Sequence, residues 1–406
     1  MPSPSNPLHP ASRCVLTINS GSSSIKFAVY CEDAPATRVL SGKIERIGLP
    51  RPVLTLRDGG KKMDPQEIAA PNHLAAGNVL ISWLEKRLGS SVLAGVGHRV
   101  VHGGIKLSKS QLLTPRVMKE LRHISPFDPE HMPFAIELIE VFRRRYPKLP
   151  QVGCFDTAFH RTMPRVAKLL PLPRKFAAKG IERFGFHGLS YTFLVGELER
   201  IAGRRAARGR VILAHLGNGA SLAAVRDGKG MDTSMAFTPA AGVPMSTRAG
   251  DLDPGLVWYL TRTERMTARD FNEMIHHHSG LLGVSGISPD MRDLLAKERK
   301  DARAADAVAL FCYQVKKWIG SFATVLGGLD TLVFAGGIGE NAFEVRERVC
   351  DGLGFLGVKL DERRNRANSP VISSAGSPVT VRVIHTDEEV VIAKAVWRVL
   401  RLRPDR

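Results

Sequence analysis

Two stretches of this sequence follow the same design, and a repeat of this kind roughly 200 residues apart indicates an internal duplication. In the first stretch, a predicted strand of residues 14–19 is followed by the glycine–serine turn 20–24. After the turn, Ile25, Phe27 and Val29 alternate with other residues. This period of two predicts a β-hairpin. In the second, residues 211–216, 217–219 and 221–225 have the corresponding strand, turn and strand patterns. We therefore expect two α/β halves built on one plan.

The length of 406 residues also favours two domains over one core. We expect a first domain of residues 14–156 that is completed by a C-terminal helix of residues 389–406, and a second domain of residues 157–388. Residues 1–13 are rich in proline and serine and predict a disordered extension. The stretch 302–326, which ends at two glycines, predicts a long helix. Further strands are expected at 151–155 and 331–334, and further helices around 134–142 and at 388–402.

Composition excludes several classes of protein. No window approaches eighteen consecutive apolar residues, so no membrane span is expected, and residues 1–13 lack the apolar core of a secretory signal. The five cysteines show no metal-type spacing, and their odd number predicts reduced thiols in the cytoplasm. The net charge of +19 favours anionic ligands. Nucleic acid is one such ligand, but no zinc finger or RNA-binding signature is present, so no specific nucleic-acid partner is expected.

Three glycine-rich turns are candidate phosphate sites. The first, 20–24, precedes Lys26; the second spans 215–221; the third, 336–341, follows a predicted strand and leads into a predicted helix. Glycine lets backbone N–H groups approach a phosphate closely. Each turn alone is also explained as a plain tight turn. Together they predict a nucleotide site, with the nucleotide between the two halves.

Charged residues stand at the ends of predicted strands. Arg99 precedes a glycine turn, Asp156 follows the strand 151–155, and Arg248 lies in a polar loop of small residues. An isolated arginine is usually a surface residue. Two arginines in glycine-flanked loops, in a chain with three phosphate-type turns, fit a transferring phosphoryl group better.

Seven motifs now identify a resemblance. Residues 19–24, 97–104, 155–160, 185–188, 215–221, 337–341 and 386–389 occur in the order found in the acetokinase family. The chain resembles this family from about residue 14 to 395. The family belongs to the superfamily of acetate and sugar kinases, heat-shock chaperones and actin. The resemblance implies an α/β fold of two duplicated ribonuclease-H-like (actin-like ATPase) domains with a nucleotide cleft between them.

The resemblance also implies a role for individual residues. It implies Mg²⁺, with Mn²⁺ as the alternative, ATP as co-substrate, acetate and acetyl phosphate as the other ligands, and a homodimer. The matched catalytic residues are Asp156, His187 and Arg248, and the matched metal ligands are Asn19 and Glu388. The matched residues for the substrate carboxylate and methyl are Arg99, Val101, Phe127, Phe186 and Pro239. The matched ATP contacts are Lys26, His215, Leu216, Gly217, Asn218, Gly219, Asp290, Met291, Arg292, Gly337, Ile338, Gly339, Glu340 and Asn341.

Three positions depart from the family pattern. Asp128 stands where a site histidine is expected, in a Pro-Phe-Asp-Pro sequence that replaces Pro-Leu-His-Asn-Pro. Its carboxylate repels an anionic acceptor unless it is paired, for which a nearby arginine is one candidate. The competing interpretation makes Asp128 the N-cap of the following helix. In addition, Tyr191 replaces a second histidine and Ser246 replaces a glycine.

The resulting hypothesis is a cytoplasmic kinase that phosphorylates acetate reversibly with ATP and Mg²⁺. A kinase for propionate or another short-chain carboxylate is the first alternative. A nucleotide-switched binding protein of the same superfamily is the second, and the presence of Arg99, His187 and Arg248 together argues against it.

Overall fold

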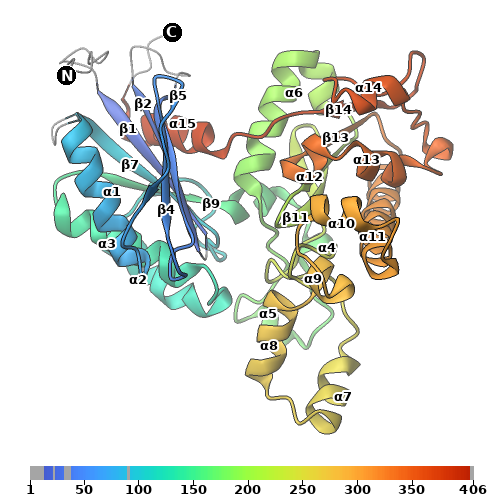
Figure 1. The fold of residues 1–406 in the computed structure, drawn as a ribbon, viewed down its shortest axis with the longest axis horizontal. Coiled ribbons are helices and arrows are strands. Elements are labelled where there is room, and N and C mark those ends of the chain that lie inside the picture. The colour runs from blue at the N-terminus through green and yellow to red at the C-terminus, as the bar shows by residue number, and fades with distance from the viewer. Residues whose placement is uncertain (1–12, 22, 32–37, 89–91, 403–406) are drawn as a thin grey trace. The chain divides into compact units, whose positions relative to one another are not determined.

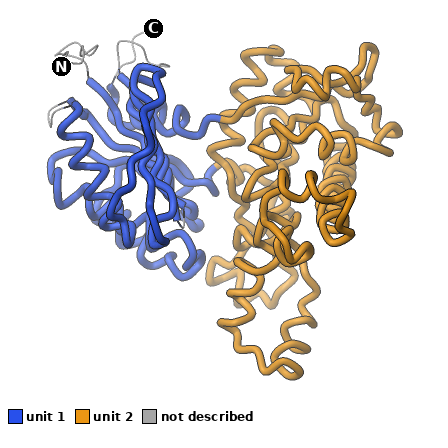
Figure 2. The backbone as a smooth tube through the Cα atoms, in the orientation of Figure 1, with its two compact units in different colours: residues 1–158, 387–406 blue, residues 159–386 orange. Residues whose placement is uncertain are grey.

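The computed structural model describes residues 13–21, 23–31, 38–88 and 92–402. The predicted extension 1–13 therefore lies almost wholly outside the described residues, as does Ser22 of the first glycine turn. The described chain forms two compact units, residues 1–158 with 387–406 (unit 1) and residues 159–386 (unit 2), which Figure 2 colours separately. No helix in these described ranges is long and apolar enough to cross a membrane.

Unit 1 is a mixed sheet with helices packed on it (Figure 1). Its strands are β1 (Cys14–Ser20), β2 (Ser24–Cys31), β3 (Arg38–Glu45), β4 (Val53–Asp58), β5 (Lys61–Lys62), β6 (Gln66–Glu67), β7 (Leu93–Val100), β8 (Gln111–Leu112) and β9 (Gln151–Phe155). Its helices are α1 (His73–Leu88), α2 (Pro115–Ile124), the 3₁₀ turn η1 (Ser125–Phe127), α3 (Met132–Arg145) and α15 (Glu388–Leu400). The sheet order β5-β4-β3-β2-β1-β7-β9-β8 places the predicted hairpin β1–β2 beside the parallel strands β7 and β9.

Unit 2 contains the second sheet, in the order β12-β11-β10-β13-β14. Its strands are β10 (Val211–Leu216), β11 (Ala220–Arg226), β12 (Lys229–Thr233), β13 (Thr331–Ala335) and β14 (Thr380–Val383). Its helices are α4 (Arg165–Lys168), α5 (Arg174–Ala177), α6 (Gly188–Arg208), α7 (Gly255–Thr263), α8 (Ala268–His277), α9 (Gly280–Ser285), α10 (Met291–Lys297), α11 (Ala302–Leu326), α12 (Gly336–Asn341), α13 (Phe343–Cys350), the 3₁₀ turn η3 (Gly354–Leu356) and α14 (Glu362–Arg366). The 3₁₀ turn η2 (Asp156–Thr162) joins the units in sequence.

The predicted duplication is confirmed by the topology of the two sheets. The order β3-β2-β1-β7-β9 in unit 1 corresponds to β12-β11-β10-β13-β14 in unit 2. In each case the first three strands are antiparallel and the last three are parallel. Both predicted hairpins are present, and α11 has the predicted bounds, with Gly327 as its left-handed C-cap. The prediction for residues 336–341 is wrong, because this segment was expected to be a loop and forms the short helix α12.

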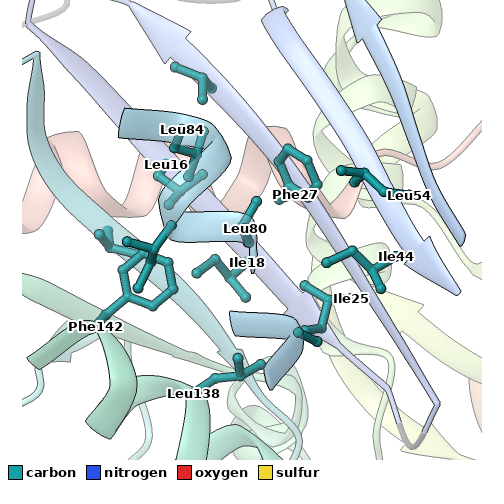
Figure 3. Packing of buried hydrophobic residues seen from close by; sticks show 14 of the residues in the cluster. Leu16, Ile18, Ile25, Phe27, Ile44, Leu54, Leu80, Leu84, Leu138 and Phe142 are labelled. Atoms are coloured by element: carbon teal, nitrogen blue, oxygen red, sulfur yellow. The ribbon is translucent and has the colours of Figure 1, made fainter. Parts of the chain in front are cut away.

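The core of unit 1 determines which face of the sheet Asn19 of β1 occupies. Leu16 and Ile18 pack among Leu80 of α1 and Phe142 of α3 (Figure 3). Because side chains alternate along a strand, Asn19 lies on the opposite face from Ile18. The final helix α15 also packs on this sheet, where Ile392 and Val396 lie against Gly97 of β7.

The prediction that all five cysteines are reduced is wrong for one pair. Cys14 and Cys31 form a disulfide, while Cys154, Cys312 and Cys350 are free and buried. The two bonded cysteines face each other in the register of β1 and β2, with Cα atoms 4.0 Å apart. A hairpin register places residues far apart in sequence side by side, which cysteine spacing alone does not reveal.

Candidate active site

Three predicted residues of unit 1 meet where parallel strands end. Asn19 lies near the carboxyl end of β1, Arg99 near the carboxyl end of β7, and Asp156 directly follows β9. These strands are adjacent and parallel, so their carboxyl ends share one edge of the sheet. Ligands of open α/β sheets bind at such edges. The sequence therefore brings three dispersed polar residues to one place.

Hydrogen bonds join these residues to Glu388, the first residue of α15. Arg99 donates to Asp156 Oδ2 from Nη2 at 2.6 Å and from Nε at 3.0 Å, and its Nη1 donates to Asn19 Oδ1 at 2.9 Å. Asn19 Nδ2 donates to Glu388 Oε2 at 2.8 Å. The sequence separations reach 369 residues, so only the fold assembles this cluster.

The cluster is buried and its charges are tightly coupled. Asp156 is fully buried and Arg99 exposes 17% of its side chain. Burial opposes the charge of Arg99, but the carboxylates of Asp156 and Glu388 outweigh it and raise the pKa of the guanidinium. Burial raises the pKa of the Asp156 carboxyl, and the contact with Arg99 opposes that shift. Arg99 is therefore a permanent buried cation, and Asp156 fixes its orientation.

Asn19 and Glu388 are the candidate metal ligands. Asn19 offers an amide oxygen and Glu388 a carboxylate, which are hard donors of the kind that Mg²⁺ prefers. In the ranges that the structure describes, no group of three or more histidine, cysteine, aspartate or glutamate side chains could hold a metal. Two oxygen donors fit an ion that retains water and also binds phosphate oxygens, which is how Mg²⁺ is commonly held.

The predicted apolar substrate residues are positioned in both units. In unit 1, Val101 is buried just after β7, and Phe127 packs its ring edge-on against His102 with centroids 5.5 Å apart. In unit 2, Phe186 is buried and its carbonyl faces Nε2 of His160 at 2.8 Å, while Pro239 is also buried. Lys26, predicted to contact ATP, is exposed on β2 opposite Asn19.

His187 of unit 2 is held in a demanding conformation. It precedes α6 with a left-handed φ of 56°, which is uncommon outside glycine and clusters at functional sites. Its Nδ1 lies 2.8 Å from Ser221 Oγ, and Tyr191 Oη lies 2.5 Å from the same oxygen. Its ring stacks on His215 with centroids 4.4 Å apart. Tyr191, which departs from the family pattern, therefore fixes Ser221 and through it the ring of His187.

Gly219 brings His187 and Arg248 together. A side-chain carbon at position 219 would lie 3.1 Å from His187 Nε2 and 3.6 Å from Arg248 Nη1. Arg248 Nη1 also lies 3.5 Å from the carbonyl oxygen of Pro239. The glycine leaves open the space in front of two nitrogen-bearing side chains. A group with negative oxygens fits this arrangement.

A pocket of about 950 Å³ lies in unit 2. It is large enough for a nucleotide and is formed by the second glycine turn, the start of α10 and the start of α12. Eight predicted ATP residues line it: Gly217, Asn218, Asp290, Met291, Arg292, Gly337, Ile338 and Asn341.

The remaining predicted ATP residues of unit 2 do not line this pocket. Leu216 is buried within β10, and the Nδ1 of His215 lies 2.9 Å from Ser190 Oγ. Glu340 accepts the backbone N–H groups of Gly336 and Thr386, and it pairs with His385 at 2.6 Å. Its geometry is that of a side chain that holds the α12 turn in place. Gly219 lies beside His187, and Gly339 is buried in α12.

Sequence reasoning missed other pocket residues. The pocket is also lined by Ser246, Pro289, Leu295, Ala296, Ala342 and Glu344. Ser246 was noted only as a departure; it is buried, and its N–H donates to the Asn218 carbonyl at 3.2 Å. Proximity to the predicted motifs is the only signal that could have found the others, because each is an ordinary helix or loop residue.

The interpretation of Asp128 as the N-cap of the following helix is wrong. The N-cap of α3 is His131, and the backbone carbonyl of Asp128 accepts the N–H groups of His131 and Met132. The carboxylate oxygen Oδ1 of Asp128 lies 2.9 Å from His131 Nδ1, a partner that was not identified from the sequence. The pair was missed because the helix was expected to start at Asp128, whereas His131 is the residue at the start of α3.

Comparison with known proteins gives a consistent answer. The model of the acetokinase family matches residues 14–394. An acetate kinase of Rhodopseudomonas palustris is 44% identical over 390 residues, which cover 95% of this chain and 98% of that protein. The crystal structure of Porphyromonas gingivalis acetate kinase superimposes with a TM-score of 0.86 at 38% identity, covering 96% of this chain and 100% of that one. A propionate kinase from Francisella tularensis gives a TM-score of 0.89 at 33% identity, covering 94% and 98%. The predicted resemblance is confirmed, and the chain belongs to the acetokinase family.

Proposed function

We propose that this enzyme is an acetate kinase, which transfers the γ-phosphoryl group of ATP to acetate and forms acetyl phosphate reversibly. The observation that carries the proposal is the buried cluster of unit 1, in which Asp156 and Asn19 hold Arg99 beside Glu388. A fixed guanidinium offers paired donors to a carboxylate. The relatives named acetate kinase, which match nearly the whole chain, support acetate as that carboxylate.

The chemistry follows from the charge of the acceptor. Acetate is already anionic, so its carboxylate oxygen attacks the γ-phosphorus without a general base. The new oxygen–phosphorus bond forms while the bond to the β–γ bridging oxygen breaks, and ADP leaves with that electron pair. We assign His187 and Arg248 to the equatorial oxygens, where charge is spread in the transition state. Asp156 acts through Arg99, which it orients, because both of its carboxylate oxygens already accept hydrogen bonds from the guanidinium.

We assign Mg²⁺ to Asn19 and Glu388, with Mn²⁺ as the alternative. The bound ion supplies neutralisation of the β- and γ-phosphate charge. Asn19 Oδ1 accepts a hydrogen bond from Arg99 Nη1. The orientation of this amide therefore affects both the position of Arg99 and the binding of the assigned metal ion. For the nucleotide, the pocket of unit 2 supports binding by the turn 217–219, by 290–292 and by 337–341.

Propionate is the second candidate acceptor, favoured by the structural likeness to the Francisella propionate kinase. Residue size argues for acetate. Phe127 stands where the family motif has leucine, and its larger ring leaves less room for an additional methylene. We therefore propose acetate as the preferred acceptor.

Hydroxylamine trapping of the acyl phosphate tests both parts of the proposal. The purified enzyme is supplied with ATP, Mg²⁺ and, separately, acetate, propionate and butyrate. We expect acetate to give the highest kcat/KM, by about tenfold or more over propionate, because one methylene in an apolar pocket discriminates to this extent. The variant Phe127→Leu should reduce the ratio of kcat/KM for acetate to kcat/KM for propionate. A higher kcat/KM for propionate would establish the alternative, and no hydroxamate with any acid would overturn the kinase assignment.

We also propose that the enzyme is a cytoplasmic homodimer. ATP as co-substrate supports the cytoplasm. Helix α7 supports self-association, because Trp258 and Tyr259 expose 67% and 59% of their surfaces beside the exposed Leu256. The variant Trp258→Asp should give the mass of a monomer by light scattering. Phe355→Asp, at another exposed aromatic of unit 2 (79% exposed), should leave a dimer. A monomeric wild type would refute the proposal.

A further inference from the structure

Helix α12 forms one side of the nucleotide pocket of unit 2 but has little stability of its own. Ile338 and Asn341 of this helix line the pocket, as does Ala342 directly after it. Three of its six residues are glycine, which loses the most backbone entropy in a helix, and helices this short are unstable in isolation. Contacts from other parts of unit 2 therefore hold α12 in place.

Arg346 of α13 binds this segment at two points. Its Nη1 donates to the carbonyl oxygen of Gly339 in α12 at 2.9 Å. Its backbone N–H donates to the carbonyl oxygen of Ala342 at 3.3 Å. At the other end of the helix, the carboxylate of Glu340 accepts the N–H group of Gly336 at 2.9 Å. Arg346 thus holds the end of α12, and Glu340 holds its start.

The guanidinium of Arg346 is itself fixed from the opposite side. Its side chain is fully buried. Its Nε donates to Oδ1 of Asn365 in α14 at 2.8 Å, and its Nη2 donates to the Asn365 carbonyl at 2.7 Å and to Asn368 Oδ1 at 2.5 Å. Asn365 is buried as well, and its Nδ2 donates to the Phe343 carbonyl at 3.0 Å. Because the guanidinium is planar and rigid, the position of α14 determines where Arg346 meets α12.

The charge of Arg346 makes its contact with α12 a strong one. Burial lowers the pKa of the guanidinium to about 10, so the side chain remains positively charged at neutral pH. A hydrogen bond from a charged donor is roughly twice as strong as one between neutral groups. An apolar residue of similar size would fill this space without the cost of burying a charge. The hydrogen bonds of Arg346, rather than its packing, therefore account for a cation at this position.

We propose that Arg346 is a positioning residue of the nucleotide site, which holds α12 where residues 337–342 contact bound ATP or ADP. The inference rests on the proposed function, and it adds a residue that acts through α12 rather than on the ligand. Without the guanidinium, α12 can shift and the nucleotide is bound more weakly. The groups assigned to the chemistry, Arg99, His187 and Arg248, lie on other elements and should be unaffected.

Binding of ADP to folded variants tests the inference without requiring turnover. Arg346→Met keeps the length of the side chain but removes its donors and its charge. In isothermal titration calorimetry with ADP and Mg²⁺, its Kd should rise roughly tenfold, because a hydrogen bond from a charged group is lost. In steady-state kinetics KM for ATP should rise with it, whereas kcat and KM for acetate should change by less than about twofold. Arg346→Lys, which keeps a cation, should show a smaller rise in Kd.

Val349→Ala is the matched control for a purely structural effect. Val349 is fully buried in the same helix, α13, and its truncation lowers stability without removing a hydrogen bond to α12. Its Tm should fall while its Kd for ADP stays at the wild-type value. If Arg346→Met does not fold, Arg346→Lys and Asn365→Ala replace it, since Asn365→Ala removes the acceptor of Arg346 Nε.

The outcomes separate this inference from the proposed function. A folded Arg346 variant whose Kd for ADP is unchanged, or rises no more than that of Val349→Ala, would overturn the inference and leave the acetate kinase assignment intact. Equal losses in the KM for ATP and for acetate would also overturn it. A wild type that binds ADP but forms no acyl phosphate from any carboxylate would overturn the proposed function, while a selective rise in the Kd of Arg346→Met would still support the inference.

Discussion

The Arg99–Asp156 ion pair gives the sharpest stability prediction for unit 1. In Asp156→Ala the guanidinium of Arg99, which is 17% exposed, loses three hydrogen bonds to a carboxylate, at 2.6, 3.0 and 3.2 Å. Breaking a buried pair from one side costs about 3–5 kcal/mol, because the remaining charge loses its nearest partner and retains only the more distant carboxylate of Glu388 at 4.0 Å. For a unit of this size each kcal/mol lowers Tm by about 2–4 °C, so we expect a fall of roughly 6–20 °C.

Differential scanning calorimetry with a matched control measures this effect. Glu85→Ala removes a carboxylate that also binds an arginine, Arg145, through two bonds in the same unit, but that arginine is 58% exposed. Its Tm should change little, because solvent screens an exposed pair. The Tm of Asp156→Asn, which keeps a hydrogen-bond acceptor for Arg99, should lie between the Tm values of Asp156→Ala and Glu85→Ala. Equal Tm values for Asp156→Ala and Glu85→Ala would refute the claim that burial makes the Arg99–Asp156 pair essential.

Three further predictions concern chemistry, metal and pH. Arg248→Ala should lower turnover on the order of 10³-fold or more at unchanged Tm, since a transition-state arginine contributes this much; near-normal turnover would remove Arg248 from the chemistry. Glu388→Ala should raise the Mg²⁺ concentration for half-maximal activity more than it changes KM for acetate, and an unaltered Mg²⁺ titration would contradict the ligand assignment. Burial lowers the pKa of His98 and of His160 to about 4, below the ordinary value of 6.5, so the unfolded chain binds protons first as the pH falls. The contribution of these two histidines to stability should therefore be fully present above about pH 6.5 and should decline towards pH 4. In an acid titration followed by circular dichroism, His98→Gln should show a smaller loss of stability over this range. A pH profile identical to that of the wild type would contradict the prediction.

The fold was predictable where the sequence has a local alternation of apolar residues or a glycine that ends a helix. The alternation in 25–30, the glycines after residue 326 and the paired glycine turns specified both hairpins and α11 closely. The Cys14–Cys31 bond was not predictable, because it depends on which residues the register places opposite each other.

The sequence motifs named the candidate site residues one by one, but they did not predict the hydrogen bonds between them. The motifs named Asn19, Arg99 and Asp156, yet their mutual bonds follow from the parallel order of β1, β7 and β9, which no local pattern specifies. Glu340 shows the opposite case. A glycine-rich motif suggested a nucleotide contact, whereas its carboxylate is occupied by backbone N–H groups that stabilise α12. Motif membership does not reveal which way a side chain is turned.

Synthesis of ATP from ADP and acetyl phosphate tests the central claim most directly, because a light-emitting luciferase assay reads the transferred phosphoryl group itself. The account predicts rapid Mg²⁺-dependent ATP formation by the wild type and a loss of at least about tenfold in kcat/KM for acetyl phosphate in Arg99→Leu, whose buried cation is removed. Absence of ATP formation by the folded wild type, or equal activity in folded Arg99→Leu, would contradict it.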